Sequence, residues 1–191
     1  GLAWIGLSEP WWSSSFSFLV ALFNDSGLSN EIYLFIGNAF LPIFVLLWLV
    51  AMGNLLDWKW KKYSTSIYSI GAIIFEIIFI YFLFTNYTII GEKVGPVDVD
   101  FGLITILFLF VNLLLFFGSG IWFAVNSLKS DQERLKLKGK FLLSAFIIFV
   151  FGTAWDIIAT NIFTRLLLVI SAIIFYMGYI LPPSVESFFI K

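Results

Sequence analysis

The sequence predicts an all-α polytopic membrane protein, a bundle of transmembrane helices, and three observations lead to that fold class. Of the 191 residues, 61% are hydrophobic and only 12% are charged, whereas a soluble domain is about half apolar and about a quarter charged. Five apolar segments each approach the roughly 20 residues that a helix needs to cross a hydrocarbon core. These segments lack the alternation of a membrane β-barrel. We therefore expect helices with lipid as their solvent.

We expect a single integral membrane domain over residues 1–191, which begins with a region that does not span the membrane. Residues 1–7 are apolar without an initiating Met, so we interpret them as the tail of a truncated N-terminal helix. Residues 16–23 are too short to span. Pro10-Trp11-Trp12 is typical of the headgroup layer, where Trp is favoured. We therefore expect an interfacial segment up to residue 30, with a re-entrant hairpin as the alternative.

The five full spans follow, and turn or cap residues separate them. Ser64-Thr65-Ser66 offers N-cap oxygens to the second span, and Gly95-Pro96 lies in the loop before the third. Pro182-Pro183 ends the fifth span, because neither residue can continue a helix. We expect the transmembrane helices at 32–56, 67–90, 101–126, 140–163 and 166–181, with a tail at 182–191.

The positive charges predict the orientation of these helices. Nine of the eleven Lys and Arg residues lie in the first loop, in the third loop at 127–140 or in the tail, which leaves only Lys93 and Arg165 on the other side. Loops rich in Lys and Arg stay in the cytoplasm. We therefore expect a multi-pass protein of the cell membrane with a cytoplasmic C-terminus.

The composition also excludes several function classes. The chain has no His and no Cys, which removes disulfides, zinc or haem sites built from those residues, and Ser-His-Asp triads. The net charge of −1 argues against a nucleic-acid partner, because such binders need a basic surface. No phosphate-binding loop of the Walker type is present. We expect no catalytic residue, no metal ligand, no cofactor and no enzymatic activity.

Four polar residues inside the predicted spans are the candidate ligand-binding site. Glu76 lies about 14 Å into the second span, near the bilayer centre, and Asp156 lies in the fourth. An ionisable group at that depth costs about 2.5–3.5 kcal/mol and is a functional-site candidate by default. Asn38, four residues before Pro42, and Asn112 lie at compatible depths. We expect Glu76, Asp156, Asn38 and Asn112 to line an outward-facing site for a small ligand or a proton.

The alternative is that these polar groups only join the helices to one another. Interhelical hydrogen bonds contribute about 0.6–2 kcal/mol each in membranes, and small residues let helices approach closely. Helical spacing places three sets of polar or small residues on shared faces. These sets are Thr105, Asn112, Ser119 and Asn126; Thr153, Asp156 and Thr160; and Ser171 with Gly178.

Several of these residues carry a resemblance to a known kind of membrane module. Pro10-Trp11-Trp12, Asn38-x-x-x-Pro42, Gly139-Lys140-Phe141 with the later Asp156, and the run SAIIFYMGYILPP at 171–183 resemble the multi-helix module of archaeal polytopic membrane proteins. That module is similar to the seven-helix sensor region that precedes histidine kinases. The resemblance implies an outward-facing sensing bundle whose last helix leads to a cytoplasmic output region. This chain has neither a phosphoacceptor His nor a kinase domain.

We therefore expect a sensor or receptor-like module of signal transduction. Its partners would be the lipid bilayer, a small ligand or a proton, and a cytoplasmic signalling partner or fused output domain. The main alternative is a small-molecule or proton-coupled transporter, which usually shows inverted repeats and broken helices. A non-catalytic membrane scaffold is the third hypothesis, for which a co-purifying partner would be the decisive observation.

Overall fold

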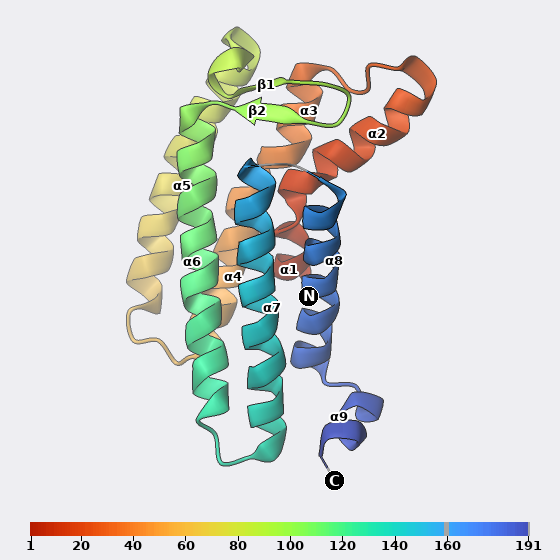
Figure 1. Cartoon of the computed structure of the whole chain (residues 1–191). Helices are drawn as coiled ribbons and strands as arrows, with labels where there is room; N and C mark the ends of the chain where they lie inside the picture. The colour runs from red at the N-terminus through yellow and green to blue at the C-terminus, as the bar shows by residue number, and fades with distance from the viewer. Residues whose placement is uncertain (159–160, 191) are drawn as a thin grey trace. The chain divides into compact units, whose positions relative to one another are not determined.

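The computed structural model describes residues 1–158 and 161–190, and it confirms the all-α membrane class (Figure 1). The chain forms two compact units, Gly1–Asn112 (unit 1) and Leu113–Lys191 (unit 2). Within the described residues, five helical segments are long and apolar enough to cross a membrane. They are Asn30–Leu55, Lys61–Thr85, Leu103–Leu128, Glu133–Asp156 and Ile162–Ile180.

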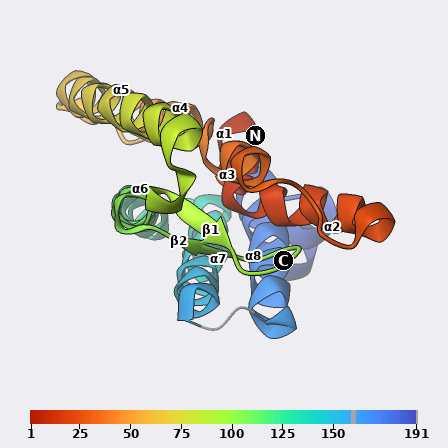
Figure 2. The same cartoon turned by 90° about the horizontal axis from the view of Figure 1, so that it is seen from above.

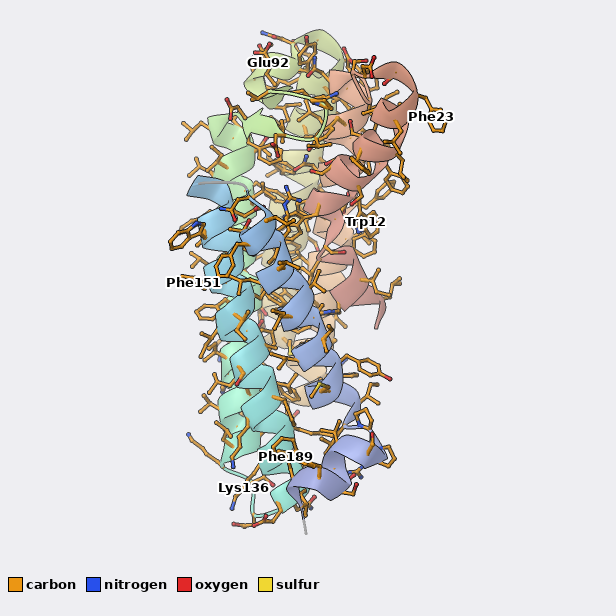
Figure 3. The ribbon with its side chains drawn as sticks, turned by 45° about the vertical axis from the view of Figure 1, so that its right-hand side comes forward. Trp12, Phe23, Glu92, Lys136, Phe151 and Phe189 are labelled. Carbon is orange, nitrogen blue, oxygen red and sulfur yellow. The ribbon has the colours of Figure 1, made fainter. Side chains whose placement is uncertain are left out.

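Unit 1 begins with three short helical segments, α1 (Leu2–Gly6), η1 (Glu9–Trp11) and α2 (Trp12–Asn24). α1 packs on α4, while η1 and α2 pack on α3. α2 leaves much of its apolar surface uncovered, and Phe23 points away from the helix with 91% of its surface exposed (Figure 3). An interfacial position for α2 stays a prediction.

The first span is interrupted in the middle. α3 (Asn30–Asn38) begins at the N-cap Ser29, whose side chain accepts a hydrogen bond from the Ile32 N–H. It ends at Asn38, and α4 (Leu41–Leu55) begins three residues later, with Pro42 in its first turn. Proline has no N–H and therefore cannot bond to the carbonyl of Asn38 four residues earlier. The sequence predicts one helix over 32–56, and Pro42 explains the break.

The second span is α5 (Lys61–Thr85), which lies beside α4 (Figures 1 and 2). It begins six residues earlier than expected, at Lys61, so Ser64 and Thr65 lie inside the helix. Their hydroxyls donate to the carbonyls of Trp60 and Lys61, four residues back. The prediction that they cap the helix is wrong, because Ser and Thr can also bond backwards within a helix.

A short hairpin connects α5 to the third span in unit 1 (Figure 1). After η2 (Tyr87–Ile89), the strands β1 (Gly91–Lys93) and β2 (Val99–Phe101) pair antiparallel, with Glu92 opposite Asp100. The third span, α6 (Leu103–Leu128), starts immediately afterwards. The expected loop with Gly95-Pro96 is therefore the turn of a hairpin.

The hairpin is tied to α2 and α3. The Tyr33 hydroxyl donates to the Val97 carbonyl over 2.8 Å, and the Ser17 hydroxyl donates to the Pro96 carbonyl. The Lys93 N–H donates to the side-chain oxygen of Asn30 over 2.9 Å. These bonds hold the hairpin against α2 and α3 at one end of unit 1.

The core of unit 1 lies beneath the hairpin and is built from α3, α5 and the residue that precedes β1. The Phe75 ring stacks on Phe108 of α6, with 3.5 Å between ring centroids. Stacked aromatic side chains bury a large apolar area. The buried cluster consists of Leu34, Phe75, Phe79, Leu83 and Ile90.

Unit 2 contains the C-terminal part of α6, then α7 (Glu133–Ile158), α8 (Ile162–Ile180) and α9 (Pro183–Phe189). Thr160, which the sequence analysis placed on a face with Asp156, lies outside the described residues, as does Lys191. α7 and α8 pack closely, and the predicted small-residue face is confirmed at this contact. Ser171 is fully buried and donates to the Ala145 carbonyl over 2.9 Å, and a Cβ on Gly178 would lie 2.9 Å from the Cβ of Phe141.

The C-terminal α9 packs against the start of α7. α8 ends at Ile180, its C-cap Leu181 adopts the left-handed conformation, and Pro183 opens α9, so the expected stop at Pro182-Pro183 is confirmed. Arg134 forms an ion pair with Glu186 at 3.1 Å, and the Phe141 ring contacts Phe189 with 5.5 Å between centroids. Within unit 2, the tail is therefore held by its own helices.

Candidate functional site

A carboxyl group from outside the span satisfies the backbone at the break between α3 and α4. The Phe40 N–H donates to Oε1 of Glu9 over 2.7 Å. Glu9 comes from η1, which packs on α3, and it is completely buried. A carboxylate that accepts an N–H at the start of a helix is stabilising, because the first N–H groups of a helix have no partner within it. Glu9 therefore holds the N-terminal end of α4.

Three buried side-chain oxygens of unit 1 have no hydrogen-bond partner among the described residues. They are Oε2 of Glu9, Oδ1 of Asn38 and Oε1 of Glu76. Asn38 is only 1% exposed, and its amide donates to the Leu34 carbonyl over 2.9 Å. Most buried polar atoms in proteins have a partner, so each unsatisfied acceptor indicates a place for a donor, a water or an ion.

The Glu9 carboxyl lies outside the five candidate spans, and its charge state depends on its surroundings. Burial raises the pKa of Glu9 to about 8, although the hydrogen bond from Phe40 opposes this rise. The Glu76 carboxyl acts in the same direction as burial, because a nearby negative charge disfavours ionisation of Glu9. Glu76 therefore contributes to the raised pKa of Glu9 within unit 1.

Asn112 has partners that join two helices of unit 1. The Tyr68 hydroxyl of α5 donates to Oδ1 of Asn112 over 2.8 Å, and the Asn112 amide donates to the Phe108 carbonyl over 2.8 Å. Asn112 is 4% exposed. The sequence places Asn112 at a depth compatible with Glu76, but its observed partner on α5 is Tyr68, about two helical turns before Glu76. These bonds favour the interpretation of Asn112 as a link between helices.

Asp156 lies in unit 2 and helps to form the turn between α7 and α8. The Thr164 hydroxyl donates to Oδ1 of Asp156 over 2.6 Å, and Arg165 pairs with the same oxygen at 3.4 Å. Thr164 also forms a capping box with Asn161 at the start of α8. These contacts account for a largely buried carboxylate within its own unit. A shared ligand site with Glu76 stays a prediction.

The structure adds Glu9 to the residues that the sequence analysis selected. A signal for it was present, because Glu9 is the one acid in the apolar and aromatic run at 1–23. Residues of this region were interpreted as interfacial, where an acid would be solvated. Only the packing of η1 on α3 reveals that its carboxyl enters the interior.

In the described ranges, no group of three or more Asp, Glu, His or Cys residues is placed to hold a metal ion. No known family, no curated protein and no solved structure matches this chain.

Proposed function

We propose that this chain is the membrane-embedded sensor module of a signalling protein, and that it binds a small ligand or a proton at its buried polar groups. The observation that carries the proposal is the set of three unpartnered buried oxygens on Glu9, Asn38 and Glu76. Acceptors without donors are costly in the interior. A ligand that brings hydrogen-bond donors or positive charge complements them.

A sensor also needs an element with two arrangements that a ligand can bias. The interrupted span supports this requirement, because its two halves are joined by residues 39–40 and the second half is held by Glu9 from another element. A ligand that changes the bonding of Glu9 changes the hold on α4. We assign the interrupted span as the responsive element.

The proposed signal leaves through the C-terminal end of unit 2. The positive charge of the first and third loops supports a cytoplasmic position for the α6–α7 turn and for α9. By the same assignment, the hairpin end of unit 1 faces outward, in the cell membrane. A cytoplasmic partner or fused output domain would receive the signal at α9, which the Arg134–Glu186 pair holds against α7.

The absence of Cys from the sequence makes a direct test possible. Ser130→Cys in the α6–α7 turn and Ser187→Cys in α9 introduce two spin labels within unit 2. Pulsed electron paramagnetic resonance in lipid nanodiscs measures the distance between them as pH is stepped or ammonium, the smallest donor-bearing cation, is added. A sensor shifts this distance, and Glu76→Gln reduces the shift. A distance that responds to neither probe contradicts the proposal.

The interrupted span also favours a second candidate function, a proton-coupled transporter. Transporters use broken helices at the membrane midplane, usually in two corresponding halves. α8 shows no matching interruption among its described residues, and neither does α7. Purified protein in vesicles loaded with a pH-sensitive dye separates the two functions, because a transporter dissipates a proton gradient and a sensor does not.

A further inference from the structure

Two acids of unit 1, the buried Glu9 and the half-buried Glu76, have no positively charged partner in the part of the chain that the structure describes. Neither Glu9 nor Glu76 forms an ion pair there, and the ion pairs found involve Glu186 and Asp156 of unit 2. α2, which packs on η1, carries no ionisable group, and neither does α4, which follows Phe40. Among the described residues, no Lys or Arg is therefore paired with either acid.

The other titratable groups near η1 are already engaged or carry no positive charge. α3 contributes Glu31 and Tyr33, and the Tyr33 hydroxyl bonds to the Val97 carbonyl. The Lys93 ammonium donates to the carbonyls of Ser26 and Leu28, at the hairpin end. From α5, Glu76 is the group that acts on Glu9.

An uncompensated charge inside a membrane protein is expensive. Insertion scales give about 2.5–3.5 kcal/mol for one acid at the centre of a helix. Two acids that repel one another cannot both stay ionised without a counter-charge. The oxygens available are of the type that hard cations prefer, and the interrupted helix resembles the unwound segments that hold Na⁺ or H⁺ in membrane proteins.

We propose that Glu9, Asn38 and Glu76 form a binding site for a small monovalent cation, either a proton or Na⁺, at the break between α3 and α4. This inference rests on the proposed function and deepens it by naming the ligand class and by adding Glu9 as a ligand. Oε1 of Glu9 stays on the Phe40 N–H, while Oε2 faces the cation. When the cation leaves, the two carboxylates repel one another and the hold on α4 weakens.

Thermal unfolding in detergent, followed by the fluorescence of the eight Trp residues, tests the site. The melting temperature is measured between about pH 5 and about pH 9, with sodium chloride or with choline chloride at equal ionic strength. A fall with rising pH that sodium prevents and choline does not identifies Na⁺ as the ligand. The same fall in both salts identifies the proton. A melting temperature that depends on neither pH nor sodium overturns the site.

Glu9→Gln assigns the response to the site, because glutamine keeps an oxygen for the Phe40 N–H and removes the charge. We expect loss of most of the pH or sodium response in this variant. Glu92→Gln, an exposed acid of the same unit, is the matched control and keeps the full response. An unchanged response in Glu9→Gln overturns the assignment of Glu9.

Infrared difference spectroscopy on the unmodified protein keeps the test independent of the folding of variants. The carbonyl stretch of a protonated carboxyl group disappears as the pH rises if the ligand is the proton, and it disappears on sodium addition if the ligand is Na⁺. The proposal is contradicted if no such band appears at any pH and the melting temperature does not depend on sodium.

Different outcomes reject the cation site and the sensor function. A cation response that depends on Glu9, together with a fixed label distance in unit 2, keeps the site and rejects the sensor. A label distance that responds while Glu9→Gln has no effect keeps the sensor and rejects the cation site.

Discussion

Removal of one hydroxyl group tests the hydrogen bond that joins α5 to α6 in unit 1. Tyr68→Phe deletes the donor to Oδ1 of Asn112, a bond of 2.8 Å between side chains that are 9% and 4% exposed. Interhelical hydrogen bonds in membranes average about 0.6 kcal/mol and reach about 1.7 kcal/mol. An acceptor left buried and unpaired costs about 1–3 kcal/mol. We therefore expect a loss of about 1–2 kcal/mol in the free energy of unfolding.

The assay is reversible unfolding in mixed micelles, arranged as a double-mutant cycle with Asn112→Leu. If the bond forms, the two substitutions couple by about 1 kcal/mol, because the second one no longer removes an interaction. Tyr81→Phe is the control, since Tyr81 lies on the same helix with 61% of its surface exposed. Equal effects of Tyr68→Phe and Tyr81→Phe, or a coupling of zero, would refute the reasoning.

Three further predictions concern packing, capping and pH. Gly178→Ala lowers the free energy of unfolding by about 1–3 kcal/mol through overpacking, because the added Cβ would lie 3.0 Å from the backbone nitrogen of Leu142. Gly118→Ala is the control: a Cβ there meets nothing within 4 Å, so this variant is neutral or stabilising in the same unfolding assay. Thr164→Val lowers the free energy of unfolding by about 1–2 kcal/mol, because it removes the helix cap of α8 and the hydrogen bond to Asp156. Thr164→Ser keeps the hydroxyl and most of this stability. A Val variant as stable as the Ser variant excludes a stabilising role for the hydroxyl. Because the pKa of Glu9 is raised in the folded state from 4.5 to about 8, its contribution to stability is fully present below pH 4.5 and is lost as the pH rises to about 8. The loss of stability is at most about 5 kcal/mol. In Glu9→Gln, the free energy of unfolding depends less on pH across this range. A free energy of unfolding of the unmodified protein that rises with pH contradicts the predicted direction.

The sequence predicted the fold class and part of the packing because lipid leaves few options for an apolar chain. Spanning backbone must pair its own polar groups, so long apolar segments form helices. The small-residue face at Ser171 and Gly178 was also predictable, since helical spacing fixes which residues share a face. The buried polar stripe of α6 is confirmed at Thr105, Asn112 and Ser119, whereas Asn126, at its end, is exposed.

The site was less predictable, because its geometry depends on contacts between distant segments. The depth of Asn112 follows from the rise of a helix, but its partner depends on helix rotation, and Tyr68 rather than Glu76 faces it. Pro42 permits a break in the first span, yet the acid that holds the break comes from Glu9, 31 positions earlier than Phe40. Periodicity carries no information about such a long-range contact.

Labelling of single introduced cysteines in intact cells tests the central claim most directly, namely that this chain crosses the membrane with its hairpin and its α6–α7 turn on opposite sides. The natural sequence has no Cys, so each signal belongs to the introduced residue. With a maleimide that cannot cross membranes, we expect Gly95→Cys to be labelled in intact cells and Ser130→Cys only after lysis. Labelling of both residues in intact cells, or recovery of the chain in the soluble fraction, would contradict the account.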